Sequence, residues 1–345
     1  MKRVSLFLRR HALVMLLSLL LAATASAETL LRSDHPSHYI VQKGDTLWDI
    51  SGRFLRSPWL WPEIWHVNPQ IANPHLIFPG DRLDLVYVDG KPRLQLSRGV
   101  LKLSPQVRSQ PWDGAIPTIP IGDISPFLSR PYVLDPGQVD QAPYIVSFGA
   151  DHILGGTGVR AYVRSLEESG GKYHVVRPGG AYRDADTDEV IGHQAIYIGT
   201  VEATQSGDPG TVFFNSSERE SVLGDRLIPV SGDTSWSNFM PHQPGDEVSG
   251  SIIGVKGGVA QIGQYNVVVL DRGASDGLEP GHVLRIDQRG ETIRDVVTPD
   301  SRDTVTLPDE EAGLLMVFRT FERISFGLVL NAVRPIHLFD RVRTP

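Results

Sequence analysis

One stretch decides the fold of the first module: His38-Tyr39-Ile40-Val41-Gln42-Lys43-Gly44-Asp45-Thr46-Leu47-Trp48-Asp49-Ile50. Tyr39 and Val41 alternate with their neighbours, which predicts a short, half-buried strand at its start. The Gly-Asp-Thr that follows opens a helix, because the side chain of either Asp45 or Thr46 can cap the amides of a first helical turn. The stretch therefore predicts a strand, a tight turn and a capped helix.

A second helix and a returning strand complete this module. Asp49 forms a shortened version of a capping box with Thr46. A second helix begins near Pro62, which is favourable at a first helical position, and ends at Asn68-Pro69. The apolar positions that define the inner faces are Leu47, Ile50, Phe54, Trp61, Ile64, Trp65, Leu83 and Leu85. Residues 38–88 are thus predicted to form a β-α-α-β module.

Together with Asn73-Pro74-His75-Leu76-Ile77-Phe78-Pro79-Gly80-Asp81-Arg82-Leu83, this pattern resembles the LysM family. Its members are small modules that bind N-acetylglucosamine-containing glycans such as peptidoglycan. In the family, sugar lies in a shallow groove between the loop that opens the first helix and the loop that leads into the last strand. The resemblance implies a glycan-binding site formed by Gly44, Asp45, Thr46, Leu47, Leu76, Ile77, Phe78 and Pro79.

The chemistry of these loops fits a sugar but also has a structural interpretation. An N-acetyl group needs amide donors and acceptors and a small apolar pocket. We expect the backbone of Gly44, Asp45, Leu76 and Phe78 to supply the polar part, and Leu47, Ile77 and Pro79 to supply the apolar part. However, Asp45 is expected to cap a helix with or without sugar, and Ile77 fits a core position equally well. The tryptophans of the long connection between the helices sit at helical spacing and favour core packing over sugar stacking; they are Trp59, Trp61 and Trp65.

The N-terminus has the pattern of an export signal. Four basic residues precede the apolar run Ala12 to Ala23, and Ala25-Ser26-Ala27 follows it. This pattern predicts a signal peptide over residues 1–27 and a flexible leader over residues 28–37. A retained membrane anchor is the alternative, but the run is shorter than the ~20 apolar residues that cross a bilayer. We expect a periplasmic protein associated with the cell wall or outer membrane, without disulfides or a lipidated cysteine because cysteine is absent.

Charge and length limit the classes of function. Removing the signal takes away four basic and no acidic residues, so the formal net charge moves from −7 to −11. Such a balance argues against nucleic acid or anionic lipid as the main partner, since both need clustered Lys and Arg. The length of the mature chain predicts two or three domains. The 34 glycines and 25 prolines indicate a turn-rich chain dominated by strands.

The remainder is predicted to be a linker and a duplicated β region. Residues 89–142 are expected to form a Pro-rich linker with a hairpin near residues 92–103. Residues 143–235 and 245–345 resemble each other and predict two small antiparallel barrels or sandwiches of five or six strands. The matched pairs are Gly149 with Gly273, Asn215 with Asn331, and Asp225 with Asp340, at offsets of 124, 116 and 115 residues. Chance similarity between β-rich segments is the alternative.

The fold class expected for the whole chain is therefore an α+β LysM module followed by mainly-β, duplicated barrel or sandwich domains. We recognise no catalytic motif in it. The absence of cysteine excludes Cys-His peptidases and cysteine transpeptidases. The sequence has no H-x-H or H-E-x-x-H pattern for zinc. A serine acyl transferase needs an activated nucleophile, and neither Gly232-Asp233-Thr234-Ser235 nor Val248-Ser249-Gly250-Ser251 has the context of one.

One acidic stretch, Asp184 to Glu189, has the alternating oxygen ligands of a calcium loop. It lacks the glycine and the distal acid of that motif, so a solvated hairpin turn is the favoured interpretation. We therefore expect no enzymatic activity, no cofactor and no metal site.

The order of signal peptide, single LysM module, linker and β region resembles the LysM-containing family of type IV pilus secretin-associated proteins. The motif Asp276-Gly277-Leu278-Glu279-Pro280-Gly281-His282-Val283 supports the resemblance. It implies a non-enzymatic protein whose module holds peptidoglycan and whose C-terminal region contacts an outer-membrane secretin, with several copies around the secretin ring. Two alternatives stay open: a general cell-wall scaffold or hydrolase activator, and, less favoured, a peptidoglycan hydrolase.

Overall fold

The computed structural model describes residues 30–65, 77–97, 116–119, 124, 127, 133–149, 152–230, 240–256, 261–298 and 302–345. The chain divides into two compact units, Met1–Pro120 and Ile121–Pro345. The predicted signal peptide lies outside the described residues. Within the described ranges, no helix has the length and apolar character needed to cross a membrane.

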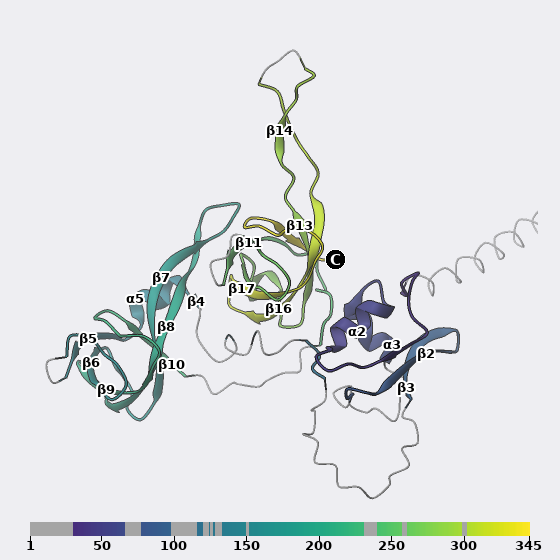
Figure 1. The fold of residues 1–345 in the computed structure, drawn as a ribbon. Coiled ribbons are helices and arrows are strands. Elements are labelled where there is room, and N and C mark those ends of the chain that lie inside the picture. Colours follow the sequence, from purple (N-terminus) through teal and green to yellow (C-terminus); the bar gives the residue numbers. More distant parts are fainter. Residues whose placement is uncertain are drawn as a thin grey trace, which may run out of the picture. The chain divides into compact units, whose positions relative to one another are not determined.

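The first unit is the predicted helix pair flanked by strands (Figure 1). Its elements are β1 (His38–Ile40), α2 (Leu47–Phe54), the 3-10 turn η1 (Pro58–Leu60), α3 (Trp61–Trp65), β2 (Arg82–Val88) and β3 (Lys91–Ser97). The three strands form one antiparallel sheet in the order β1-β2-β3. The expected end of the second helix, at Asn68-Pro69, lies outside the described residues.

Two features of this unit differ from the prediction. The hairpin is formed by β2 and β3, joined by Asp89 and Gly90, whereas we expected it near residues 92–103. Both turn residues have positive φ, 51° and 74°, as a two-residue turn that matches the strand twist requires. The leader also contributes to the fold, because Leu31 is buried and pairs with Leu55.

The core of the first unit holds the side chains that the sequence placed on inner faces. Phe54, Ile77 and Leu83 are fully buried. Trp61 and Trp65 belong to the same apolar cluster. Trp59 is buried as well. The three tryptophans are thus packing residues, as their helical spacing indicated.

The second unit contains two six-stranded rings of antiparallel strands. The strands of the first are β5 (Tyr144–Phe148), β6 (Arg160–Arg164), β7 (Lys172–Arg183), β8 (Val190–Gln205), β9 (Gly210–Ser217) and β10 (Arg226–Pro229). They pair in the order β5-β6-β9-β8-β7-β10 and back to β5. The short strand β4 (Val133–Leu134), followed by helix α5 (Pro136–Gln141), adds to the outer side of β8.

The second barrel repeats this topology strand for strand. Its strands are β11 (Ser249–Val255), β12 (Val267–Leu270), β13 (Val283–Gln288), β16 (Glu310–Thr320), β17 (Ser325–Ala332) and β18 (Arg341–Arg343), closed in the order β11-β12-β17-β16-β13-β18. A 3-10 turn, η3 (Ala274–Asp276), follows β12, and a hairpin of β14 (Thr292–Arg294) and β15 (Thr304–Thr306) stands out between β13 and β16 (Figure 1). Taken as first to sixth, the strands of both barrels neighbour one another in the order 1-2-5-4-3-6. The duplication predicted from the sequence is therefore present in the strand order.

Matching backbone hydrogen bonds give the residue equivalence. Ile145 N donates to Asp225 O at 3.0 Å, and Ile252 N donates to Asp340 O at 3.0 Å. In each barrel the residue before the aspartate returns a bond to the isoleucine oxygen, at 2.8 and 2.7 Å. The offset between the copies is thus 107 residues at the first strand and 115 at the last.

This register corrects part of the sequence alignment. The Asp225–Asp340 match is right, but Asn215 is equivalent to residue 330 and so is one residue out. The match of Gly149 with Gly273 is wrong by a whole strand, because β5 corresponds to β11 and not to β12. An apolar strand followed by Gly-Ala marks a strand end anywhere in a barrel, and therefore cannot identify one particular strand.

A glycine at the same place in both barrels allows two neighbouring strands to approach closely. A Cβ added at Gly199 would collide with the carbonyl oxygen of Ser216, and a Cβ at Gly313 would collide with that of Asn331. These glycines lie on the equivalent strands β8 and β16 and allow the backbone of the next strand to approach closely. Each barrel has its own apolar core. The core of the first barrel includes Phe214, and the core of the second includes Leu315.

Candidate functional site

The loop between β1 and α2 is built as a hydrogen-bonded turn. Thr46 caps the helix: its Oγ1 accepts from Asp49 N at 3.1 Å, and Asp49 Oδ2 accepts from Thr46 N at 3.3 Å. Asp45 forms the preceding turn, since its Oδ2 accepts from Gln42 N at 2.8 Å and from the Tyr39 hydroxyl at 2.9 Å. The sequence left two capping candidates open, and the cap is Thr46.

The loop before β2 lies against this turn. Val41 N donates to Asp81 O at 2.9 Å and Gly80 N donates to Val41 O at 2.8 Å, which continues the pairing of β1 with β2 into both loops. Phe78 N donates to Asp81 Oδ2 at 3.0 Å. Ile77 is fully buried in the same cluster as Leu47. Two of the three apolar residues proposed to contact sugar are therefore covered by protein.

A short segment of the chain, Ile116 to Ile119, bridges the two loops. Leu47 N donates to Pro117 O at 3.0 Å and Trp48 N donates to Thr118 O at 3.1 Å. On the other side, Ile116 N donates to Ile77 O at 2.8 Å. Leu47 and Trp48 are the first residues of α2, whose amides have no partner inside the helix. The segment therefore satisfies backbone groups at the place where the family resemblance puts the glycan.

The segment is a packed part of the module. Ile116, Thr118 and Ile119 are buried, and Ile116 belongs to the apolar cluster of the module. From the sequence, these residues were predicted to belong to a linker and were not connected with the groove. The Ile-Pro repeats in this region were the available signal, because such pairs favour an extended backbone that can lie between two loops.

Of the predicted site residues, Thr46, Leu47 and Ile77 are buried, and Gly44 is exposed with a φ of +94°. Asp45, Phe78 and Pro79 are half-buried. Leu76 lies outside the described residues. Burial and the hydrogen bond to Asp45 raise the pKa of Tyr39, so its hydroxyl remains a donor at neutral pH. The assignment of these residues to sugar binding stays a prediction.

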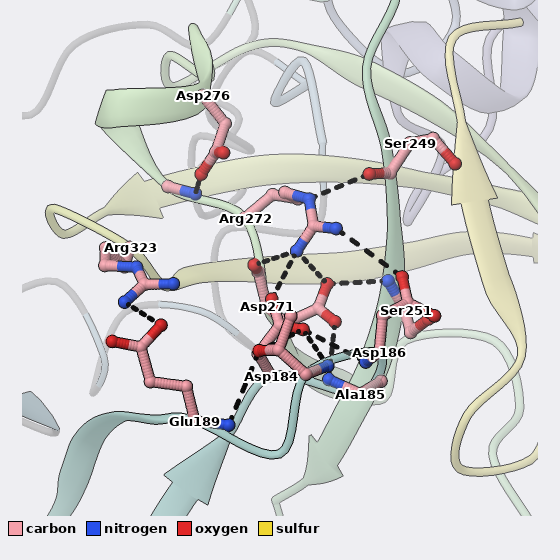
Figure 2. Close-up of polar contacts among 12 residues, drawn as sticks. Asp184, Ala185, Asp186, Glu189, Ser249, Ser251, Asp271, Arg272, Asp276 and Arg323 are labelled. Carbon is pink, nitrogen blue, oxygen red and sulfur yellow. Dashed lines mark hydrogen bonds and ion pairs between the residues drawn. The ribbon is translucent and has the colours of Figure 1, made fainter.

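The acidic turn between β7 and β8 is a hairpin turn, as expected, but it is not solvated throughout. Asp184 is buried, and its Oδ1 accepts from Asp186 N at 3.0 Å and Thr187 N at 2.9 Å. Its Oδ2 pairs with Arg272 at 3.0 Å (Figure 2). Burial opposes ionisation, but these hydrogen bonds outweigh it and lower the pKa of Asp184. Arg272, 88 residues further along the chain, therefore neutralises the carboxylate of Asp184, which would be a ligand in a calcium loop.

One other cluster among the described residues could hold a metal ion: His242, Glu279 and His282 each offer a ligand atom, and these atoms lie within 4.8 Å of one another. A parallel β-bridge between the histidines brings them together from positions forty residues apart. However, His282 Nδ1 accepts from Glu279 N at 3.1 Å, which leaves the proton of the neutral ring on Nε2. An ion would have to displace that bond or that proton, so the cluster is a weak metal candidate. The expectation of no metal site stays a prediction.

Comparison with known proteins supports the first module. A segment of the chain is 42% identical over 60 residues to the uncharacterized protein YqbP of Bacillus subtilis (strain 168); the match covers 14% of this chain and 27% of that protein. Residues 39–85 match the family described as the LysM domain. LysM domains bind N-acetylglucosamine-containing glycans such as peptidoglycan. The chain therefore carries a LysM domain, and the Ile116–Ile119 segment joins the two loops that are predicted from the sequence to bind glycan.

Proposed function

We propose that the protein is a non-enzymatic wall anchor of the bacterial envelope. After removal of the signal peptide, the LysM domain binds peptidoglycan, and the two barrels hold an outer-membrane secretin of a type IV pilus. Glycan binding is supported by two loops, Gly44–Leu47 and Ile77–Pro79, which lie side by side in a segment that matches the LysM domain. The layout of one such domain followed by tandem barrels supports the secretin end.

The Ile116–Ile119 segment competes with glycan in this proposal. The segment bonds to the amides of Leu47 and Trp48 and to the carbonyl of Ile77. We propose that a sugar N-acetyl group takes these same backbone groups. The same backbone groups cannot serve both at once. Glycan binding therefore includes release of the segment, and the affinity of the free domain is reduced by the fraction of time that the groove is covered.

Sedimentation with purified peptidoglycan sacculi tests the glycan end. The mature chain should sediment with sacculi, and a chain lacking residues 28–120 should stay in the supernatant. The deletion ends at 120 because β3 and the Ile116–Ile119 segment both belong to the first unit. Circular dichroism of the truncated chain provides the folding control. Sedimentation of this truncated chain to the same extent would refute the anchor.

Affinity purification from crosslinked envelopes tests the protein end. The full chain should recover a secretin, and a chain reduced to the first unit should not. Recovery of a peptidoglycan hydrolase in place of a secretin would support the alternative role as a hydrolase activator. Release of soluble muropeptides by the purified protein would contradict a non-enzymatic role.

A further inference from the structure

The hairpin of β7 and β8 extends beyond the first barrel and ends on the second barrel. Ala185 N donates to Asp271 Oδ2 at 3.1 Å, and Arg272 pairs with Asp184 at 3.0 Å (Figure 2). At the edge of the contact, Arg323 Nη1 lies 2.8 Å from Glu189 Oε2. The tip of one barrel's hairpin is thus held by the β12 end and the β16–β17 turn of the next barrel.

Apolar contacts support these polar ones. Ile324 Cδ1 lies against Gly192, where a Cβ would meet it at 2.8 Å, and the ring of Tyr182 lies beside Gly254. Burial raises the pKa of Tyr182 to about 12. The hairpin therefore docks through the half-buried ring of Tyr182 together with the buried carboxylate of Asp184.

The second barrel carries the equivalent hairpin. Val175 and Ile286 occupy matching positions, since each pairs with a glycine of the following long strand, so the offset here is 111 residues. The same offset places Arg294-Asp295-Val296-Val297-Thr298 on Arg183-Asp184-Ala185-Asp186-Thr187. The Arg-Asp-x-x-Thr pattern is thus repeated at the two tips.

The two tips also share their hydrogen bonding. Asp295 Oδ1 accepts from Val297 N at 2.8 Å and from Thr298 N at 3.3 Å, the positions at which Asp184 accepts from its own turn. Asp295 N donates to Asp303 O at 2.9 Å, as Asp184 N donates to Glu189 O at 2.9 Å. The second hairpin therefore has the form of the first one.

Over the residues that the structure describes, the second hairpin is more exposed than the first. The side chains of Val296 and Val297 are 83% and 89% exposed, and Ile293, Val305 and Leu307 are exposed as well. β14 and β15 form a two-stranded sheet by themselves. Such a pair is marginally stable in water without a packed face. Five exposed apolar residues on one projecting hairpin indicate a surface that another protein covers.

We propose that this hairpin docks onto the first barrel of a second copy of the chain. Within one chain, the equivalent β7–β8 hairpin already contacts the second barrel. The matching receiver for the β14–β15 hairpin is therefore the first barrel of a second copy, which has the same strand order. The receiving surface on the first barrel corresponds to Asp271, Arg272 and Arg323 of the second. By the offsets of 107 and 115 these positions are Arg164, Ser165 and Asp208.

The receiving positions are accessible and charged. Arg164 and Asp208 form an ion pair whose two side chains are about half exposed, and Ser165 beside them is exposed. The incoming tip presents Arg294 and Asp295, which can pair with Asp208 and Arg164. The contact is head-to-tail, so it continues to further copies, either into a ring or into a filament. The proposed wall anchoring needs no such contact, and the inference is independent of it.

Sedimentation equilibrium of the mature chain over a wide concentration range tests the proposal. The wild type should self-associate, and the double variant V296D/V297D should have a dissociation constant at least about tenfold higher, because it removes the two most exposed apolar side chains of the tip and adds two carboxylates beside Asp208. Val333→Asp is the matched control, since Val333 is 64% exposed and follows β17, outside the β14–β15 hairpin. A wild type that stays monomeric, or equal association of wild type and V296D/V297D, would overturn the proposal.

Cysteine pairing gives the geometry, because the chain has no native cysteine. A mixture of the single variants Val297→Cys and Ser165→Cys should form a disulfide-linked heterodimer under mild oxidation. A mixture of Val333→Cys with Ser165→Cys should not. Equal crosslinking in the two mixtures would contradict the contact, as would capture by a photocrosslinker at residue 297 of a secretin in place of a second copy.

Discussion

Shortening Ile116 should strengthen glycan binding by the LysM domain. Ile116 is 4% exposed, and its amide donates to Ile77 O at 2.8 Å. Truncation to alanine removes most of this buried apolar side chain and weakens the packing of the segment by at least about 2 kcal/mol. The three backbone bonds of the segment contribute roughly 1 kcal/mol each, and they are lost together when the segment leaves.

The size of the effect follows from the coverage of the groove. If the segment covers the groove most of the time, a loss of about 2 kcal/mol raises the uncovered fraction, and therefore the apparent affinity, up to ~30-fold. Ile116→Val loses one methylene, about 0.8 kcal/mol, and should tighten binding only ~4-fold. The graded series separates release of the segment from general damage to the domain.

Calorimetric titration with a chitin pentasaccharide is the assay, and hydrogen exchange at the amides of Leu47 and Trp48 is the accompanying readout. In the free wild type these amides should be protected, and in Ile116→Ala they should exchange faster. Equal affinity of wild type and Ile116→Ala, with both amides still bonded to the segment when sugar is bound, would refute the competition. If no variant binds any glycan while the domain stays folded, the glycan function itself is wrong.

Three further predictions concern stability. Thr46→Ala should destabilise the LysM domain by about 1 kcal/mol in urea unfolding, because the capping box is lost, and Thr46→Ser should restore most of it. Gly313→Ala should cost at least about 2 kcal/mol through its collision with the next strand, whereas Gly180→Ala, which meets no atom within 4 Å, should be nearly neutral. Tyr182 should ionise near pH 12 in the difference absorbance between wild type and Tyr182→Phe. Because the pKa of Tyr182 is raised in the folded state, the stability that Tyr182 contributes is present below its unfolded pKa and is lost as pH rises through about 12. Ionisation of Tyr182 at the pH of exposed tyrosines would contradict its position in the docking contact.

The LysM domain could be predicted largely because its signals are local. Strand alternation at Tyr39 and Val41, the Thr46 cap and the helical spacing of Ile50 and Phe54 each act within a few residues. The hairpin at Asp89-Gly90 was missed although it carries a strong two-residue turn signal. The expectation of a Pro-rich linker from residue 89 outweighed it.

The duplication was predictable in outline but not in register. The later strands share Asp225 and Asp340, which make the same turn in each copy, so that match was right and the neighbouring match of Asn215 was out by only one residue. The first strands carry no such polar marker: Gly149 corresponds to Lys256, and nothing in the two residues suggests it. Apolar alternation identifies a strand without identifying its neighbours, because neighbours are chosen by pairing across the barrel.

The sequence by itself determined the local elements of this protein: a helix pair between strands, two repeated antiparallel units of five or six strands, and a chain without cysteine chemistry. Only the tertiary structure decided where the polar groups of those elements find partners. The amides at the start of α2 bond to Pro117 and Thr118, and Asp184 pairs with an arginine 88 residues away. Both choices depend on which distant segments close against each other, a long-range effect that propensity and periodicity do not contain.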